Sequence, residues 1–249
     1  MMEVEDQEPI GDPPKKRSIK FLWLFLALLV LGVGAYAVTQ SSFLSVEAVT
    51  VKGVENRVTE EEVLEAANIG EGTSMIGLDL AKIDEGVTSL SWVSEVTVER
   101  KWPRTILITL TEREPSVIAV TPSGKKFLLD RSGVVLDQID ENGAALPVIR
   151  VDDIGVLGTQ ISGITPLLRA AEEVTPDLGL WILALAPTGG GVRAELVGGV
   201  VAELGFGTDF RDEMRSLATV LTRVQLSCIE VIDVSIHQNP VITRTQGKC

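Results

Sequence analysis

The chain has 249 residues, of which 45% are hydrophobic and 4% aromatic, and its formal net charge is −13 at pH 7. This length accommodates one or two modest domains beside a single membrane anchor. The acidic balance argues against a protein that binds nucleic acid or anionic lipid, and the scarcity of aromatic residues argues against a carbohydrate-stacking surface. Other proteins are therefore the expected partners.

The first predicted element is a transmembrane helix over residues 21–39, after a polar cytoplasmic tail over residues 1–20. Residues 21–38 carry no charge, and at about 1.5 Å per helical residue they span roughly 27 Å, close to the hydrocarbon thickness of a bilayer. The next basic residue after this run is Lys52. The basic residues before it are Lys15, Lys16, Arg17 and Lys20. The positive-inside rule therefore predicts a cytoplasmic N-terminus and an extracytoplasmic bulk.

A cleaved signal peptide is the alternative interpretation of this segment, because Ala35-Tyr36-Ala37 offers an A-x-A-like cleavage site. Two features favour the uncleaved anchor. The apolar run exceeds the usual length of about 7–15 residues, and the polar stretch before it is long for a signal peptide. We therefore expect a single-pass protein of the cell membrane.

Residues 43–113 have the pattern of a small β-α-α-β-β domain. Alternation over residues 46–51 predicts a strand, and Thr59 followed by Glu62 forms a capping-box pattern that opens a helix. Apolar residues at helical spacing predict a second helix over residues 78–90. Two strands follow, one on each side of a turn at Trp102. This order predicts a small sheet covered on one face by two helices.

Residues 114–243 are predicted to form a second, mainly β domain, and residues 244–249 a C-terminal tail, so the fold class is α+β. Its two expected helices begin at Thr165, as N-cap before Pro166, and at Asp209, the latter running to about residue 225. The predicted strands cover residues 117–120, 127–130, 134–137, 181–185, 192–196, 200–204, 229–236 and 241–243. The Gly- and Asp-punctuated residues 141–160 are assigned to no strand or helix.

No catalytic chemistry is recognisable. His237 and Cys228 could suggest a thiol nucleophile pair, but they lie nine residues apart along one predicted strand and would point to opposite faces. Cys228 and Cys249 could pair in an oxidising compartment, or Cys228 could be a buried thiol and Cys249 incidental. No nucleophile elbow, zinc-protease motif or phosphate-binding loop occurs. We predict no enzyme, no cofactor and no metal site.

Four segments together carry a family resemblance. They are Leu90-Ser91-Trp92-Val93, Val98-Glu99-Arg100-Lys101-Trp102-Pro103, Leu110-Thr111-Glu112-Arg113-Glu114-Pro115 and Leu128-Leu129-Asp130-Arg131-Ser132-Gly133-Val134-Val135. The chain from Phe43 to Thr243 resembles the FtsQ/DivIB cell-division family. In that family the first three segments lie in a POTRA domain of β-α-α-β-β order, and the fourth opens the following β domain. The spacing R-x-W-P…E-R-x-P is the most specific element.

The resemblance implies a non-catalytic divisome scaffold at the division septum. Such a scaffold links early cytoplasmic division proteins to the septal peptidoglycan synthases, and its implied partners are single-span proteins of the FtsB (or DivIC) and FtsL types. The implied recruitment surface of the POTRA domain contains Val98, Arg100 and the neighbouring Trp102. The residues implied to bind the FtsB-type partner are Ile236, Gln238, Asn239, Pro240, Val241, Ile242 and Thr243. A late edge strand suits this role because its backbone can accept a partner strand.

Three features remain open to more than one interpretation. Arg100, Lys101 and Arg104 form a basic spot around Trp102 that fits either a docking surface or a solvated turn with Trp102 packed on the sheet. Glu213 stands where the family commonly carries a lysine, and Ser235 stands where it often carries an arginine, which leaves the partner contacts there open. Two other functions are possible: a POTRA-bearing component of another export or assembly system, and an anchored extracytoplasmic enzyme.

Overall fold

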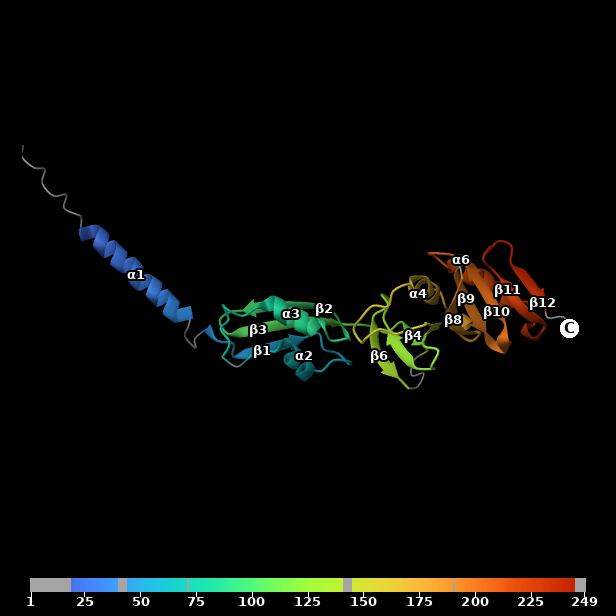
Figure 1. Cartoon of the computed structure of the whole chain (residues 1–249), viewed down its shortest axis with the longest axis horizontal. Coiled ribbons are helices and arrows are strands. Elements are labelled where there is room, and N and C mark those ends of the chain that lie inside the picture. Colours follow the sequence, from blue (N-terminus) through green and yellow to red (C-terminus); the bar gives the residue numbers. More distant parts are fainter. Residues whose placement is uncertain (1–18, 40–43, 71, 141–144, 190, 245–249) are drawn as a thin grey trace, which may run out of the picture. The chain divides into compact units, whose positions relative to one another are not determined.

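The computed structural model of the chain describes residues 19–39, 44–70, 72–140, 145–189 and 191–244 (Figure 1). The chain divides into two compact units, each described here by itself. One unit comprises residues 1–48, 70–78 and 100–106, and the other comprises residues 49–69, 79–99 and 107–249. The predicted cytoplasmic tail lies outside the described residues up to residue 18, as does the C-terminal tail from residue 245.

Helix α1 runs from Ile19 to Thr39, where the sequence predicts an anchor. Its first basic side chain, Lys20, precedes the apolar run, and the side chains of residues 21–34 are exposed. Within the residues that the structure describes, no helix meets the length and hydropathy required of a membrane span.

The β-α-α-β-β order predicted for residues 43–113 is confirmed. Its elements are β1 (Ala48–Lys52), α2 (Glu60–Ala67), α3 (Leu80–Thr88), β2 (Val93–Lys101) and β3 (Thr105–Glu112). The three strands form one sheet in the order β1-β3-β2. The predicted capping box is present, because the Glu62 amide donates to the Thr59 hydroxyl while the Glu62 carboxylate accepts from the Thr59 amide.

Two glycines in this region are required by close backbone approaches. Gly86 lies inside α3, where glycine usually weakens a helix. A Cβ at Gly86 would lie 2.3 Å from the Ala66 carbonyl oxygen, so glycine lets α3 pack directly on α2. At the end of β1, Gly53 has φ +86°, and a Cβ there would lie 1.9 Å from the Leu110 carbonyl oxygen of β3.

The second sheet has nine strands in the order β12-β11-β10-β9-β8-β7-β4-β5-β6. Its strands are β4 (Val117–Val120), β5 (Lys126–Leu129), β6 (Val135–Ile139), β7 (Val148–Arg150), β8 (Ile182–Thr188), β9 (Gly191–Leu196), β10 (Val201–Gly205), β11 (Ile229–Asp233) and β12 (Val241–Arg244). Pairing is parallel between β4 and β7, β7 and β8, and β10 and β11, and antiparallel elsewhere. The predicted α+β class is confirmed.

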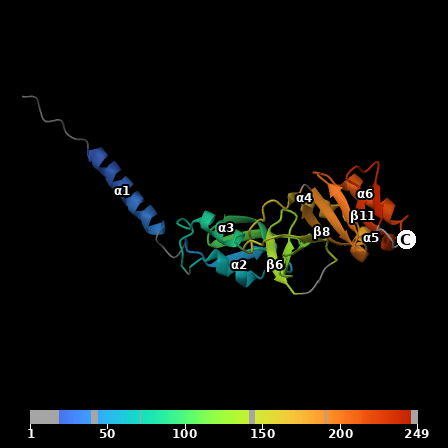
Figure 2. The same cartoon turned by 45° about the vertical axis from the view of Figure 1, so that its right-hand side comes forward.

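Helices cover this sheet along its length. They are α4 (Thr165–Glu172), α5 (Pro176–Gly179) and α6 (Arg211–Leu221), with short 3₁₀ turns η2 (Val197–Gly199) and η3 (Leu226–Cys228). Helix α4 packs against β7, β8 and β9, and α6 packs against β10 (Figures 1 and 2). Leu185, Phe210 and Leu217 are fully buried in this core. The helices therefore bury the middle strands of the sheet, β7 to β10, in this core.

Both predicted helix starts in this region are wrong in detail. Thr165 is already inside α4, the N-cap position is Ile164, and no side chain caps the helix. Helix α6 has Phe210 at its N-cap, although the Asp209 carboxylate accepts a hydrogen bond from the Arg211 amide at 3.1 Å. It ends at Leu221, earlier than predicted. The sequence also gave no indication of β7, which lies in the stretch left unassigned.

Candidate interaction surfaces

Arg100, one of the expected recruitment residues, is used inside the fold. Its Nε donates to the Met75 carbonyl oxygen at 2.7 Å, and its Nη2 donates to the Leu78 carbonyl oxygen. These bonds hold the loop that precedes α3, and the arginine is only half exposed. Its guanidinium is thus committed to two backbone carbonyls and is not displayed for a partner.

Val98 and Trp102 have different surroundings from each other. Val98 is half-buried in β2. Trp102 lies in the turn between β2 and β3, and 58% of its surface is exposed. The interpretation of Trp102 as a residue packed on the sheet is therefore not supported. The three expected recruitment residues share one end of a strand, but only Trp102 is displayed.

The expected FtsB-type binding residues lie at the open end of the nine-stranded sheet. Strand β12 pairs antiparallel with β11, with Ile232 opposite Ile242, and is the last strand in the sheet order. All four of its residues are exposed, Val241 by 60%. The approach from Ile236 to Pro240, including Gln238 and Asn239, is also exposed apart from the half-buried His237. The structure therefore brings these residues together along one edge.

A pocket of about 370 Å³ adjoins this approach. It is lined by Asp212, Arg215, Ser216, Thr219, Val220 and Arg223 of α6 and its C-cap turn, and by His237 and Pro240. Glu213, at the position where the family commonly has lysine, lies 3.7 Å from His237. Arg223 supplies positive charge to the pocket, whereas Arg215 is paired with Asp212 at 2.9 Å. Neither was singled out from the sequence, because spacing along the chain does not place them beside Pro240.

Ser235, the second departure from the family pattern, terminates β11. The Asp233 carboxylate accepts hydrogen bonds from the Ser235 amide at 3.0 Å and from its hydroxyl at 2.6 Å. This is a local turn in which the side chain of Ser235 is already satisfied. It directs the chain away from the sheet before the approach to β12 begins.

The thiol pair considered from the sequence is excluded by the state of Cys228. Cys228 is disulfide-bonded and carries no free thiol. Cys249 lies outside the described residues. His237 lines the pocket, and its Nδ1 lies 3.7 Å from Glu213 Oε1. Across the described ranges, no group of His, Cys, Asp and Glu side chains has the arrangement of a metal site.

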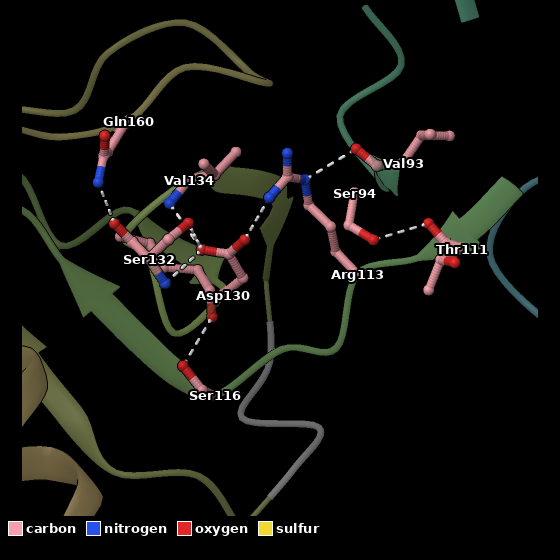
Figure 3. Close-up of polar contacts among 10 residues, drawn as sticks. Val93, Ser94, Thr111, Arg113, Ser116, Asp130, Ser132, Val134 and Gln160 are labelled. Atoms are coloured by element: carbon pink, nitrogen blue, oxygen red, sulfur yellow. Dashed lines mark hydrogen bonds and ion pairs between the residues drawn. The ribbon is translucent and has the colours of Figure 1, made fainter. Parts of the chain in front are cut away.

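Two of the four family-like segments, those that contain Arg113 and Asp130, meet in a partly buried ion pair (Figure 3). Arg113, from the segment after β3, donates from Nη1 to the Asp130 carboxylate at 2.6 Å and from Nε to the Val93 carbonyl oxygen at 2.9 Å. The other oxygen of Asp130 accepts from the Ser132 amide and hydroxyl and from the Val134 amide. The Arg113–Asp130 contact therefore ties β2 to the turn that follows β5.

Burial alone would raise the pKa of Asp130. The hydrogen bonds from Ser132 and Val134, together with the positive charge of Arg113, outweigh burial and hold the pKa of this carboxyl below its ordinary value. Asp130 is therefore ionised at neutral pH. The sequence placed Asp130 in a motif, but it did not show that Arg113 is its partner.

Glu112, one residue before Arg113, also holds a loop through hydrogen bonds to its carboxylate. Its carboxylate accepts backbone amides from Glu55, Arg57 and Val58, as well as from Asn56. Slight burial would raise the pKa of Glu112, but these four donors lower it. Glu112 is thus a structural residue that fastens the loop before α2.

These observations agree with comparisons to known proteins. Residues 44–113 match the family described as "POTRA domain, FtsQ-type". The chain is 31% identical over 166 residues to the cell division protein FtsQ of Streptomyces bingchenggensis, covering 66% of this chain and 62% of that protein. The chain therefore contains an FtsQ-type POTRA domain and is similar to FtsQ cell division proteins over most of its length. The POTRA match also places the Arg113 motif at the end of that domain.

Two further FtsQ relatives extend the similarity. FtsQ of Streptomyces collinus is 28% identical over 234 residues, which cover 88% of each chain. FtsQ of Mycobacterium bovis is 28% identical over 209 residues, covering 83% of this chain and 65% of that protein. The matched region is thus less than two thirds of the length of the Streptomyces bingchenggensis and Mycobacterium bovis relatives. With the Streptomyces collinus protein, the similarity runs through both the POTRA and the β regions.

Proposed function

We propose that this FtsQ homologue acts in bacterial cell division as a non-catalytic scaffold. The observation that carries the proposal is the open strand β12, which ends a nine-stranded sheet with all four residues exposed. Exposed edges normally invite unwanted pairing, so proteins usually cover or charge them. An edge left apolar at Val241 and Ile242 suits a protein whose partner adds a strand there.

The partner at this edge is a single-span protein of the FtsB or DivIC type, acting together with one of the FtsL type. Backbone hydrogen bonds along β12 supply affinity, and the side chains from Ile236 to Thr243 supply specificity. The adjacent pocket contains Arg223, and Arg215 paired with Asp212, so its net positive charge suits an acidic side chain on the partner segment that flanks the added strand. The scaffold thereby connects early division proteins to the septal peptidoglycan synthases.

Helix α1 is the membrane anchor of this scaffold, with residues 1–20 in the cytoplasm. Its support is the uncharged apolar run after Lys15, Lys16, Arg17 and Lys20, together with the exposure of Phe21 (77%) and Leu31 (72%), which an aqueous protein would cover. The POTRA domain then comprises residues 43–113 and the β domain residues 114–243. The part of β2 around Val98 serves recruitment to the division site.

Depletion of the protein in the bacterium that encodes it tests the general proposal. The expected result is filamentous cells with unconstricted septa, because septal synthesis lacks its link to the early division proteins. Normal division after depletion would refute a divisome role. It would leave a component of another assembly system as the function to examine.

A pair of substitutions tests the docking strand. Val241→Asp places a charge on the proposed docking strand β12 and is expected to abolish co-purification of the FtsB-type protein. Leu183→Asp is the matched control, because Leu183 is 57% exposed on β8 and lies away from the edge. The placement on β12 is wrong if both variants capture the partner equally well.

A further inference from the structure

Three segments converge at one end of the POTRA sheet, and we call them the proximal tip: residues 44–48, 72–78 and 100–106. All three belong to the same compact unit. Ser45 bridges Ser74, the Met75 amide donates to the Leu44 carbonyl oxygen at 2.7 Å, and the Glu47 amide donates to the Arg104 carbonyl oxygen at 2.9 Å. Arg100 adds its two bonds to the 72–78 loop. The tip is therefore a fixed surface.

The chain itself keeps this tip close to the end of α1. Five peptide links join Thr39 to Leu44. A chain of that length reaches at most roughly 18 Å when fully extended. The argument rests on the proposed function, in which α1 spans the membrane. The tip then lies within a short tether of the headgroup layer, which adds about 5–8 Å on each side of the hydrocarbon core.

The tip displays apolar side chains of the kind found at membrane interfaces. Trp102 is 58% exposed and Ile76 is 49% exposed, while Met75 beneath them is fully buried. Tryptophan is enriched at headgroup level because its ring is apolar and its N–H can remain hydrated. A rigid turn that presents Trp102 also loses little side-chain freedom on insertion.

The charge of the tip differs in sign from that of the rest of the external region. The tip contains Arg100, Lys101 and Arg104 against a single acid, Glu47, so its formal charge is +2. Glu71, outside the described residues, would reduce this only to +1. After residue 39 the whole chain has 30 acidic and 18 basic residues. The acidic composition that argued against anionic lipid is therefore an average that does not hold at this end.

We propose that the proximal tip is a lipid-contacting surface, with Trp102 and Ile76 in the headgroup layer of the bilayer that α1 crosses. Lys101 precedes Trp102 and contributes to the positive formal charge of the tip, which favours anionic headgroups. Arg100 and the Arg104–Glu47 pair, at 2.6 Å, position the turn. The POTRA domain is thus seated on the membrane at two points, the anchor and the tip.

Quenching of tryptophan emission by brominated acyl chains tests this contact. The full chain and the variants Trp102→Phe and Trp181→Phe are reconstituted in phosphatidylcholine and phosphatidylglycerol vesicles, with and without bromine. The difference in emission between the full chain and Trp102→Phe is the emission of Trp102. We expect brominated acyl chains to quench this emission at least about twofold, because Trp102 lies at the interface. Trp181 lies on the β domain and is 39% exposed. Its emission, obtained in the same way from Trp181→Phe, is expected to be unchanged by bromine.

Two results separate this proposal from its premise. Release of the wild-type chain from the membrane by alkaline extraction would refute the anchor itself. An extraction-resistant chain whose Trp102 emission is unaffected by bromine would overturn the lipid contact and leave Trp102 to a protein partner. Ile76→Asp provides an independent check, because a charge at the tip is expected to reduce the quenching of Trp102 while α1 stays inserted.

Discussion

The two edges of the nine-stranded sheet are treated in opposite ways. At the β6 edge, the Val135 amide donates to the Thr159 carbonyl oxygen at 3.0 Å, and the Gly158 amide donates to the Val135 carbonyl oxygen at 2.7 Å. A bridge between Val134 and Gln160 extends this cover. At the β12 edge, no described segment pairs beyond the strand. Because the β6 edge is covered while the β12 edge is left open, the open edge is expected to serve a function.

The turn at Asp130 helps to hold the segment around residues 158–160 against the β6 edge. Asp130 orients Ser132 and Val134, and the Ser132 carbonyl oxygen then accepts a bond from Gln160 Nε2 at 2.6 Å. Arg113 connects the same turn to the end of β3. The covered edge therefore lies next to the joint between the two sheets, whereas β12 lies at the far end of the strand order.

The largest expected effect is at the covered edge. Val135→Asp would place a carboxylate at a position with no exposed surface, without any partner for its charge. We expect a loss of more than about 3 kcal/mol in the free energy of unfolding, measured by chemical denaturation. A loss below that for a soluble, monomeric variant would show that the cover at β6 opens easily, which would weaken the contrast between the edges.

A smaller effect is expected at the turn that supports the cover. Asp130→Asn removes the charge paired with Arg113 and should lower the free energy of unfolding by about 2 kcal/mol at pH 7. The folded-state pKa of Asp130 lies below its unfolded value, so its contribution is present above about pH 4 and is lost as the pH falls through the folded pKa.

The measurement is the difference in unfolding free energy between wild type and Asp130→Asn across this pH range. The difference should shrink toward zero in acid, because the wild-type carboxyl then becomes neutral as well. Glu112 and Glu62, whose pKa values are also lowered, titrate in both proteins and cancel. A difference that stays constant down to acid pH would contradict the assigned ion pair.

The smallest effect on stability is expected at the open edge. Val241→Asp should change the free energy of unfolding by no more than about 0.5 kcal/mol, because the side chain is exposed. Thermal unfolding of this variant and of Leu183→Asp should therefore nearly coincide with that of the wild type. A clear destabilisation by Val241→Asp alone would mean that β12 is integral to the core and is not a displayed strand.

Local patterns predicted much of this fold. The capping box of Thr59 and Glu62 was predictable because its two residues are three positions apart and act on each other alone. The strand β7 was not, because three residues between glycines and aspartates carry no periodicity. Its place is set by β4 and β8, which hydrogen-bond to it on both sides.

The candidate surfaces were predicted unevenly for the same reason. A last strand over residues 241–243 was predicted from the sequence, and its role as a partner surface came from the family resemblance and stays a prediction. Arg100 was assigned to a recruitment surface, yet its donors are taken by Met75 and Leu78, which only the fold brings near. The sequence identifies charged residues as candidates for a binding surface. It does not show whether their side chains already donate hydrogen bonds to backbone carbonyls that lie far away in the sequence.

The short length of β7 affects how the nine-stranded sheet unfolds. Only Val148, Ile149 and Arg150 pair with β4, and only Ile149 is in register with β8 at Leu185. Hydrogen bonding across the sheet is thus thinnest along this seam. Partial opening is expected to begin there, which would separate the strands β4 to β6 from β8 to β12 as two cooperative folding units. Strain applied at the partner edge could then be relieved at the seam before it reached the POTRA domain.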